Sequence, residues 1–159
     1  PQCASCPMAD ICQAKQQTRT AELPRKKTAP EVQTLPLYWL IVRNQDGEIL
    51  LEKRPAKGIW GGLYCVPCFE TLNETYACAE KLGIVSDDLS EQPALTHRLT
   101  HRLLMITPFE AQISSPDTLP RSENASKDNR FWVQPENLAD YGLPKPLADY
   151  LKQKQQALF

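Results

Sequence analysis

Residues 13–36 limit where this chain can fold, because they cannot supply a hydrophobic core. They consist mainly of Gln, Thr, Lys and Arg, with Pro24 and Pro30 interrupting any helix. From residue 13 to residue 30 the cations are Lys15, Arg19, Arg25, Lys26 and Lys27, and the one acid is Glu22. We expect residues 13–36 to form an extended basic linker, either a soluble tether or a strap that contacts phosphates. Compact structure is therefore expected in residues 37–159.

Three cysteines near the start of the chain have the spacing of metal ligands. Cys3, Cys6 and Cys12 form a C-x2-C-x5-C run. Structural zinc sites and cubane iron–sulfur clusters each take four protein ligands, so three thiolates leave such a site one ligand short. We expect residues 1–12 to be the remnant of a metal- or cluster-binding loop of a longer protein. In this chain alone the three thiols are expected to carry no metal.

A second cysteine pair, Cys65 and Cys68, has the C-x2-C spacing of redox and zinc-knuckle motifs. This pair follows a glycine-rich loop, whereas a thioredoxin-type pair opens a helix. We therefore interpret both residues as buried, inert thiols.

The composition favours a globular protein over a membrane or secreted one. Of the 159 residues 42% are hydrophobic and 23% are charged, and the formal net charge is −1. No apolar run approaches the roughly eighteen residues of a membrane span, and no signal segment opens the chain. The cysteine pattern does not indicate export, so we predict reduced thiols and a cytoplasmic location.

Hydrophobic patterning beyond Pro36 predicts a mixed α/β fold. The expected elements are strands at 37–43 and 48–54 joined by a turn at 44–47, a loop at 55–67, a helix at 71–83, strands within 94–112, a mobile loop at 114–129, a strand at 130–134 and a helix from Pro146. The first helix has a capping box, with Thr71 at its N-cap and Glu74 three residues later. The order indicates a mixed sheet flanked by helices and preceded by an extended N-terminal tail.

Two segments resemble one known family. Residues 58–67 resemble the pattern G-[LM]-W-G-G-x-[WY]-x-x-P, with Ile59 at the Leu or Met position; this pattern is found in MutT-like (Nudix) domains and in the C-terminal domain of the MutY adenine DNA glycosylases. Residues 97–102 resemble the H-x-F-S-H loop of the MutY family, with Leu99 at the Phe position and Thr100 at the Ser position. The resemblance implies a Nudix-like fold.

Two further segments extend this resemblance to nearly the whole chain. Residues 141–146 resemble the G-L-P-x-P end of the MutY family. Cys3, Cys6 and Cys12 resemble the last three ligands of its C-x6-C-x2-C-x5-C loop. In the intact protein, the resemblance implies that these cysteines ligate a [4Fe-4S] cluster.

The resemblance implies a role in DNA repair. MutY enzymes remove adenine mispaired with 8-oxoguanine during base excision repair, a reaction that requires the adenine to be flipped out of the duplex. The chain resembles the 8-oxoguanine-recognition domain of such a bacterial-type enzyme, whose catalytic domain is a separate N-terminal unit. The implied partners are that catalytic domain and double-stranded DNA containing the mispair. We assign no catalytic residue in this chain, and we expect a monomer associated with the nucleoid.

A Nudix hydrolase would share the fold, and the helix at 71–83 distinguishes the two functions. Pyrophosphate hydrolysis needs carboxylates clustered on one helix to hold divalent cations. When the Nudix signature is aligned on Gly83, its Arg, Glu, Glu and Glu positions hold Tyr76, Ala77, Glu80 and Lys81. Because only one of these charged groups remains, we predict that the chain is not a Nudix hydrolase.

The predicted DNA- and lesion-binding loop consists of His97, Arg98, Leu99, Thr100, His101 and Arg102. Arginines suit phosphates, a threonine hydroxyl suits a base edge, and a leucine can insert between stacked bases. The histidines suit either partner, and in a strand-like segment they lack the helical arrangement of a metal pair. Weaker candidates for DNA contact are Arg25, Lys26, Lys27, Arg54, Lys57 and Trp60.

Three alternatives stay open at this point. The segment 97–102 could be a simple turn whose histidines bond only to nearby backbone groups. The chain could be a nucleotide-pyrophosphate hydrolase with a displaced metal site. It could also be a protein-docking module on an inactive Nudix fold, for which residues 114–129 offer the most obvious surface.

Overall fold

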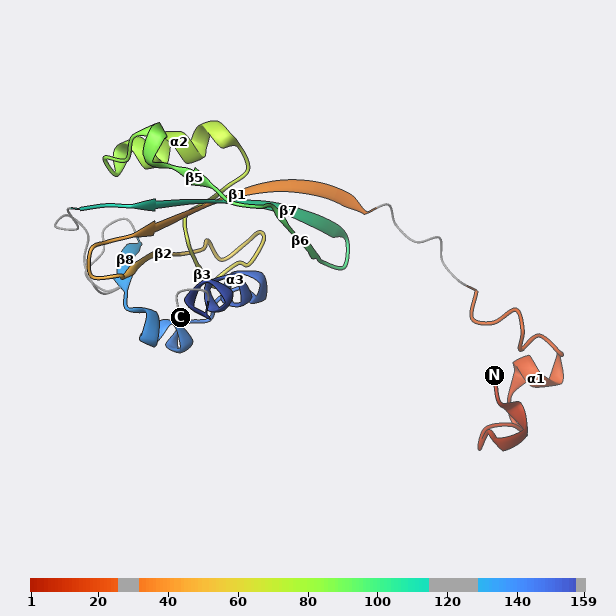
Figure 1. Cartoon of the computed structure of the whole chain (residues 1–159). Helices are drawn as coiled ribbons and strands as arrows, with labels where there is room; N and C mark the ends of the chain where they lie inside the picture. Colours follow the sequence, from red (N-terminus) through yellow and green to blue (C-terminus); the bar gives the residue numbers. More distant parts are fainter. Residues whose placement is uncertain (26–31, 115–128, 157–159) are drawn as a thin grey trace. The chain divides into compact units, whose positions relative to one another are not determined.

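A computed structural model describes residues 1–25, 32–114 and 129–156 (Figure 1). The chain divides into two compact units, Pro1–Glu31 and Val32–Phe159. The first unit contains a 3-10 helix, η1 (Cys3–Ser5), and a short helix, α1 (Gln13–Gln16). It therefore differs from the predicted extended tail over residues 13–16, because Gln, Ala and Lys are good helix formers.

The second unit is built on one mixed β-sheet. Its described strands are β1 (Gln33–Arg43), β2 (Ile49–Lys53), β3 (Tyr64–Cys65), β4 (Cys68–Phe69), β5 (Ser90–Glu91), β6 (Leu95–Arg98), β7 (Arg102–Gln112) and β8 (Arg130–Val133). The order across the sheet is β3–β2–β1–β7–β5, with β4 also paired to β1, β6 to β7 and β8 to β2. Among these pairs β1 and β7 are parallel and the others are antiparallel. The predicted mixed sheet is confirmed.

The parallel pair β1–β7 is the longest in the sheet and begins earlier than the sequence suggested. All 11 residues of β1 lie opposite residues of β7, starting with Gln33 opposite Arg102. The predicted linker therefore ends before Gln33 rather than at Pro36. Pro36 lacks an amide hydrogen, and the strand accommodates it because, in the described part of the chain, β4 pairs with β1 only at Tyr38 and Trp39.

The predicted first hairpin and first helix are both confirmed. Strands β1 and β2 are antiparallel and joined by a short turn. Helix α2 (Leu72–Lys81) has the predicted capping box: the Glu74 amide donates to the Thr71 hydroxyl at 3.3 Å, and the Thr71 amide donates to the Glu74 carboxylate at 3.2 Å. Gly83 follows the helix with a φ of 76°, a conformation that glycine adopts without strain.

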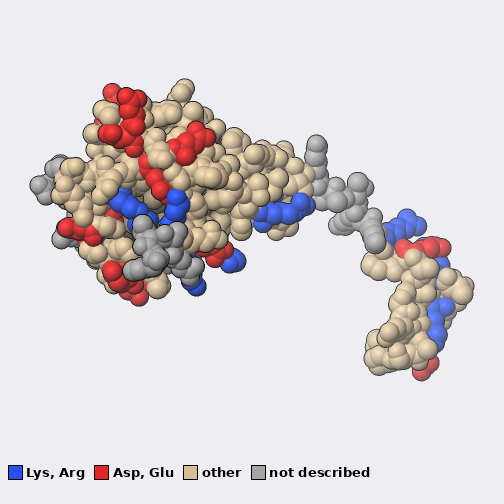
Figure 2. Space-filling view, viewed as in Figure 1, with Lys and Arg blue, Asp and Glu red and all other residues tan. Residues whose placement is uncertain are grey.

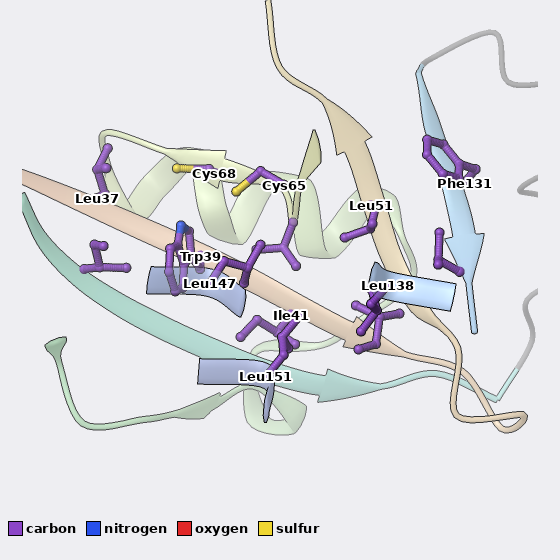
Figure 3. Close-up of a cluster of buried hydrophobic side chains, with 14 of the residues drawn as sticks. Leu37, Trp39, Ile41, Leu51, Cys65, Cys68, Phe131, Leu138, Leu147 and Leu151 are labelled. Atoms are coloured by element: carbon purple, nitrogen blue, oxygen red, sulfur yellow. The ribbon is translucent and has the colours of Figure 1, made fainter. Parts of the chain in front are cut away.

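Helices α2 and α3 (Lys145–Gln156) cover opposite faces of the sheet (Figure 1). Side chains alternate along a strand, so β1 supplies both hydrophobic clusters. Leu37, Trp39 and Ile41 pack with Leu147 and Leu151 of α3, and Figure 3 shows Trp39 among them. On the other face, Leu40 and Val42 pack with Cys78 and Ala79 of α2.

Two 3-10 helices, η2 (Ser86–Asp88) and η4 (Pro135–Asp140), connect the larger elements.

Two further predictions concern segments outside the sheet. The strand predicted at 130–134 is present as β8, and the last helix is present as α3. The predicted loop at 114–129 lies outside the described residues except for its two end positions. No helix among the described residues is long and apolar enough to cross a membrane.

A polar cluster fastens α3 to β7 and to Gln92, which follows β5. The Tyr150 hydroxyl donates to Glu110 Oε1 on β7 at 2.6 Å. Lys154 Nζ lies 3.2 Å from Glu110 Oε1 and donates to Gln92 Oε1 at 2.8 Å. Burial and the adjacent Glu110 carboxylate raise the pKa of Tyr150, so the hydroxyl remains a donor at neutral pH.

We predict that Tyr150→Phe lowers the free energy of unfolding by about 1 kcal/mol, because it removes this hydrogen bond and leaves the ring in place. Urea denaturation provides the measurement. Tyr38→Phe is the matched control, since the Tyr38 hydroxyl has no hydrogen bond within the described residues, and its change should stay below about 0.5 kcal/mol. Equal losses in the two variants would contradict the assignment.

Candidate nucleic-acid interface

Residues 97–102 form the tip of the β6–β7 hairpin. The turn is closed by the Leu99 amide, which donates to the Arg102 carbonyl at 2.8 Å. Along the end of β6 and into the turn that follows it, the side chains alternate: His97 and Leu99 are partly buried, whereas Arg98 and Thr100 are exposed. The side chains of the six predicted residues therefore do not all lie on the same side of the hairpin.

The segment between β2 and β3 forms a tight loop. The Arg54 amide donates to the Leu63 carbonyl at 2.8 Å, which closes the base of the loop. Trp60 has a φ of 56°, in the left-handed region that side chains other than glycine rarely adopt. A Cβ atom at Gly61 would lie 2.6 Å from the Ala56 carbonyl oxygen, so only glycine fits at this position without a backbone shift.

The hairpin tip and this loop line a single groove of about 440 Å³. The lining residues are Gly58, Ile59 and Trp60 from the loop, and Leu99, Thr100, His101 and Arg102 from the hairpin. Ile59, Trp60 and Leu99 are partly buried and pack against the core. The remaining hairpin residues are exposed, so the groove combines an apolar wall with polar and cationic groups.

The wall of the groove is supported from inside the protein. The Trp60 ring packs against the fully buried Trp39, with 5.9 Å between the ring centroids. Trp39 lies on β1 and also contacts Tyr150 of α3, at 6.3 Å between centroids. A ring held in this way presents a defined surface rather than a mobile side chain.

Acidic residues are absent from both chain segments that line the groove. Residues 53–69 and 92–109 contain no Asp or Glu, and they carry five cations: Lys53, Arg54, Lys57, Arg98 and Arg102. Figure 2 shows acidic side chains over the body of the domain near α2, and basic without acidic ones where β1, β6 and β7 project. An anionic ligand would therefore meet little repulsion at the groove.

The structure brings together only part of the predicted site. Leu99, Thr100, His101 and Arg102 line the groove with Trp60, whereas His97 and Arg98 lie along β6 and do not. Ile59 was missed by sequence reasoning, although its place between two residues of the glycine-rich motif could have indicated it.

The basic residues predicted as weaker candidates for DNA contact lie in different environments. Arg54 Nη1 donates to the Cys68 carbonyl at 3.2 Å and lies 3.8 Å from Glu52 Oε1, so this guanidinium stabilises the loop instead of facing solvent. Lys57 is exposed beside the groove, and Arg25 is exposed in the first unit. Lys26 and Lys27 lie outside the described residues.

The first unit provides three thiols near the start of the chain. Cys3, Cys6 and Cys12 are free thiols, and Cys6 is exposed. Cysteine thiolates are the ligands that iron–sulfur clusters take in proteins. No three His, Cys, Asp or Glu side chains in the described part of the chain are grouped so that they could hold a metal ion.

The predicted burial of Cys65 and Cys68 is confirmed (Figure 3). Burial raises the pKa of Cys65 well above its ordinary value and that of Cys68 to about 11. Burial also raises the pKa of Cys78 on α2. Thiols with raised pKa values react poorly, because the thiolate is the nucleophile.

Comparison with known proteins places this fold in a family. The sequence profile of the NUDIX domain matches residues 38–153, which is well over half of the chain. The chain belongs to the NUDIX domain family. The domain is also similar in fold to the C-terminal domain of mouse MUTYH, solved in complex with human PCNA: the TM-score is 0.56 at 14% identity, over 77% of this chain and 89% of that one.

Two curated relatives of this NUDIX domain are adenine DNA glycosylases from Buchnera aphidicola. One, from subspecies Schizaphis graminum, is 27% identical over 96% of this chain; the other, from subspecies Baizongia pistaciae, is 24% identical over 92%. The chain spans 43% and 40% of the lengths of these relatives. The predicted resemblance to adenine DNA glycosylases is confirmed.

Helix α2 of this NUDIX domain lines a separate pocket of about 520 Å³. Tyr76, Ala77 and Glu80, which occupy signature positions for the hydrolases, lie in its lining. Glu80 is the single carboxylate among the lining residues, so the pocket offers one of the several acidic ligands that a catalytic magnesium site would need.

We predict that Gly61→Ala destabilises the domain by about 1–3 kcal/mol, because the added methyl group overlaps the Ala56 carbonyl. Thermal or urea unfolding gives the measurement. Gly142→Ala is the matched control, since a Cβ there would lie at an ordinary 3.5 Å from Leu63, and its effect should stay below about 0.5 kcal/mol. A Gly61→Ala variant as stable as the wild type would show that the loop is not held in this conformation.

We also predict that the six thiols separate into two kinetic classes. In native protein at mildly alkaline pH, Cys3, Cys6 and Cys12 should react with a thiol reagent within minutes, because they are at least partly exposed. Cys65, Cys68 and Cys78 should react only on unfolding. Alkylation followed by peptide mass spectrometry assigns each site. Rapid native labelling of Cys65 or Cys68 would instead favour a redox role for that pair.

Proposed function

We propose that this chain is the 8-oxoguanine-recognition domain of an adenine DNA glycosylase. The observation that carries the proposal is the groove, where the hairpin residues Leu99–Arg102 and Trp60 come together in segments without acidic residues. The match to adenine DNA glycosylases over nearly the whole chain supports it.

The hairpin residues have separate tasks in this proposal. Arg98 and Arg102 are exposed and bind backbone phosphates, which supply affinity without reading the sequence. The Thr100 hydroxyl exchanges hydrogen bonds with the edge of the damaged base. Leu99 packs on the core, so we assign it to apolar contact with a base and not to insertion between stacked bases.

The intact protein would remove adenine mispaired with 8-oxoguanine in double-stranded DNA. We propose that a separate catalytic domain flips the adenine and hydrolyses its N-glycosidic bond. Cys3, Cys6 and Cys12 would bind a [4Fe-4S] cluster together with a fourth thiolate from elsewhere in that protein. We further propose that the protein acts as a monomer in the bacterial cytoplasm, at the nucleoid.

We also propose that the domain has lost NUDIX hydrolase activity. The replacement of three of the four charged signature positions by Tyr76, Ala77 and Lys81 supports this proposal. Incubation with Mg²⁺ and 8-oxo-dGTP therefore serves as the comparison assay, and product formation would favour the hydrolase alternative.

The DNA-binding proposal predicts that the chain binds duplex containing an 8-oxoguanine:adenine pair more tightly than undamaged duplex at low salt. Thr100→Ala should reduce that preference about two- to ten-fold, because a single side-chain hydrogen bond contributes about 0.5–1.5 kcal/mol. Arg102→Ala should weaken binding to both duplexes alike and reduce its salt dependence. Fluorescence anisotropy with labelled duplexes measures both effects.

Thr96→Ala is the matched control, since Thr96 is an exposed threonine on β6, the strand that leads into the turn, and does not line the groove. It should bind both duplexes like the wild type. If Thr100→Ala keeps the full preference for the lesion, the hairpin is not the recognition element.

A further inference from the structure

We propose that the pocket lined by α2 and by the residues that follow it, here called the α2 pocket, binds an arginine-bearing basic segment of a partner protein. The inference goes beyond the proposed function, because it concerns the other face of the sheet. Ile84 of this pocket belongs to the hydrophobic cluster under α2, whereas Trp60 of the groove packs on the cluster under α3. The α2 pocket and the groove are therefore separate sites.

One wall of the α2 pocket is a single face of the helix. The residues that α2 presents in this row are Asn73, Tyr76, Ala77 and Glu80. Their spacing of three and four residues places them one above the other along the helix. The capping box of Thr71 and Glu74 fixes the first turn of α2, so this wall is already formed in the free domain.

The other wall is formed where the chain turns back after the helix. The turn occurs at Gly83, and the Ile84 amide then donates to the Ala79 carbonyl at 2.9 Å. Ile84 and Val85 thus lie against the helix and line the pocket with it. The volume of about 520 Å³ is within the roughly 300–1,000 Å³ of sites that take small ligands, so it can hold an anchoring side chain of a partner.

Exposed hydrophobic side chains gather around the α2 pocket. Four large hydrophobic side chains are exposed in the described part of the second unit, and three of them are Leu72, Tyr76 and Val85. Val85 retains 61% of its accessible surface, which a partner would cover with a gain in free energy. Exposed apolar side chains that cluster, rather than occur singly, are typical of surfaces that bind another protein.

The charge around the α2 pocket decides what kind of partner fits. Residues 70–91 contain six acidic residues and a single basic one, Lys81. Glu80 lines the pocket, and Asp87 follows directly after the lining residue Ser86. Figure 2 shows acidic side chains gathered near α2. Such a surface repels a nucleic acid and attracts a basic segment of a protein.

Tyr76 and Glu80 together provide a site for one arginine. They lie four residues apart, on adjacent turns of the same helix face. The Tyr76 ring is braced by the buried Phe109 of β7, with 6.0 Å between the ring centroids. The Glu80 carboxylate has no hydrogen bond or ion pair with another described residue. A guanidinium can stack on an aromatic face while it pairs with a carboxylate, which an ammonium group does less well.

The experiment uses the whole chain and a short fluorescein-labelled peptide composed of arginine, leucine and alanine. Fluorescence anisotropy at low salt measures its affinity, and ¹H–¹⁵N spectra locate its binding site. Two comparison peptides carry lysine or glutamate in place of every arginine. We expect the arginine peptide to bind most tightly, the lysine peptide more weakly and the glutamate peptide not measurably. The amide resonances of Ala77, Glu80 and Val85 should shift with the arginine peptide.

Substitutions in the α2 pocket should weaken binding of the arginine peptide. Glu80→Lys should do so at least about five-fold, because repulsion replaces attraction. Tyr76→Ala should do so about two- to five-fold, whereas Tyr76→Phe keeps the aromatic face and should bind like the wild type. Asp140→Lys is the matched control, since it makes the same change of charge at an exposed residue of η4, outside this pocket. All three positions are exposed, so each variant should fold, and its spectrum checks this.

Four results would overturn the proposal. The first is equal affinity of the wild type and Glu80→Lys for the arginine peptide. The second is an equal loss in Glu80→Lys and Asp140→Lys, which would show attraction by overall charge alone. The third is equal affinity for the arginine and lysine peptides, which would contradict the choice of arginine. The fourth is self-association of the wild type that Glu80→Lys abolishes in sedimentation velocity, which would make a second copy of the chain the occupant.

Discussion

The parallel pairing of β1 with β7 is the interaction on which the rest of this domain depends. It joins two strands that are far apart in the sequence, since β1 ends at Arg43 and β7 begins at Arg102. The pairing includes all 11 residues of β1. Because β1 alternates between the two faces, the same pairing organises the cluster under α2 and the cluster under α3. It also sets the position of the candidate site, since Arg102 begins β7 at the end that carries the β6–β7 turn.

The candidate site is supported by the hydrophobic core and is not an independent surface loop. Trp39 contacts Trp60 of the glycine-rich loop and Tyr150 of α3, so one buried ring connects the wall of the groove to the last helix. Gly61 allows the loop to approach its own backbone closely, and the Arg54 guanidinium fastens that loop to the Cys68 carbonyl. A rigid wall of this kind reduces the entropy lost when a ligand is bound.

The features that could be predicted from the sequence depend on nearby residues. The β1–β2 turn and the Thr71–Glu74 capping box are local, and both occur as predicted. The early start of β1 could not be predicted, because Gln33 pairs with Arg102, which is distant in sequence. Contacts between residues far apart in the sequence also explain two errors in the predicted site. Arg54 was predicted to contact DNA because of its charge, but its guanidinium bonds to the Cys68 carbonyl within the fold. Ile59 was not predicted, because its place in the groove depends on the position of the hairpin.

The uneven distribution of acidic residues has a consequence for how the domain meets a polyanion. Figure 2 shows carboxylates over the body of the domain, whereas the two segments that line the groove contain none and carry Lys57, Arg98 and Arg102. For the proposed DNA partner, such an uneven distribution of charge would favour encounters in which the groove faces the polyanion. The arrangement would raise the fraction of productive encounters even though the chain as a whole is nearly neutral.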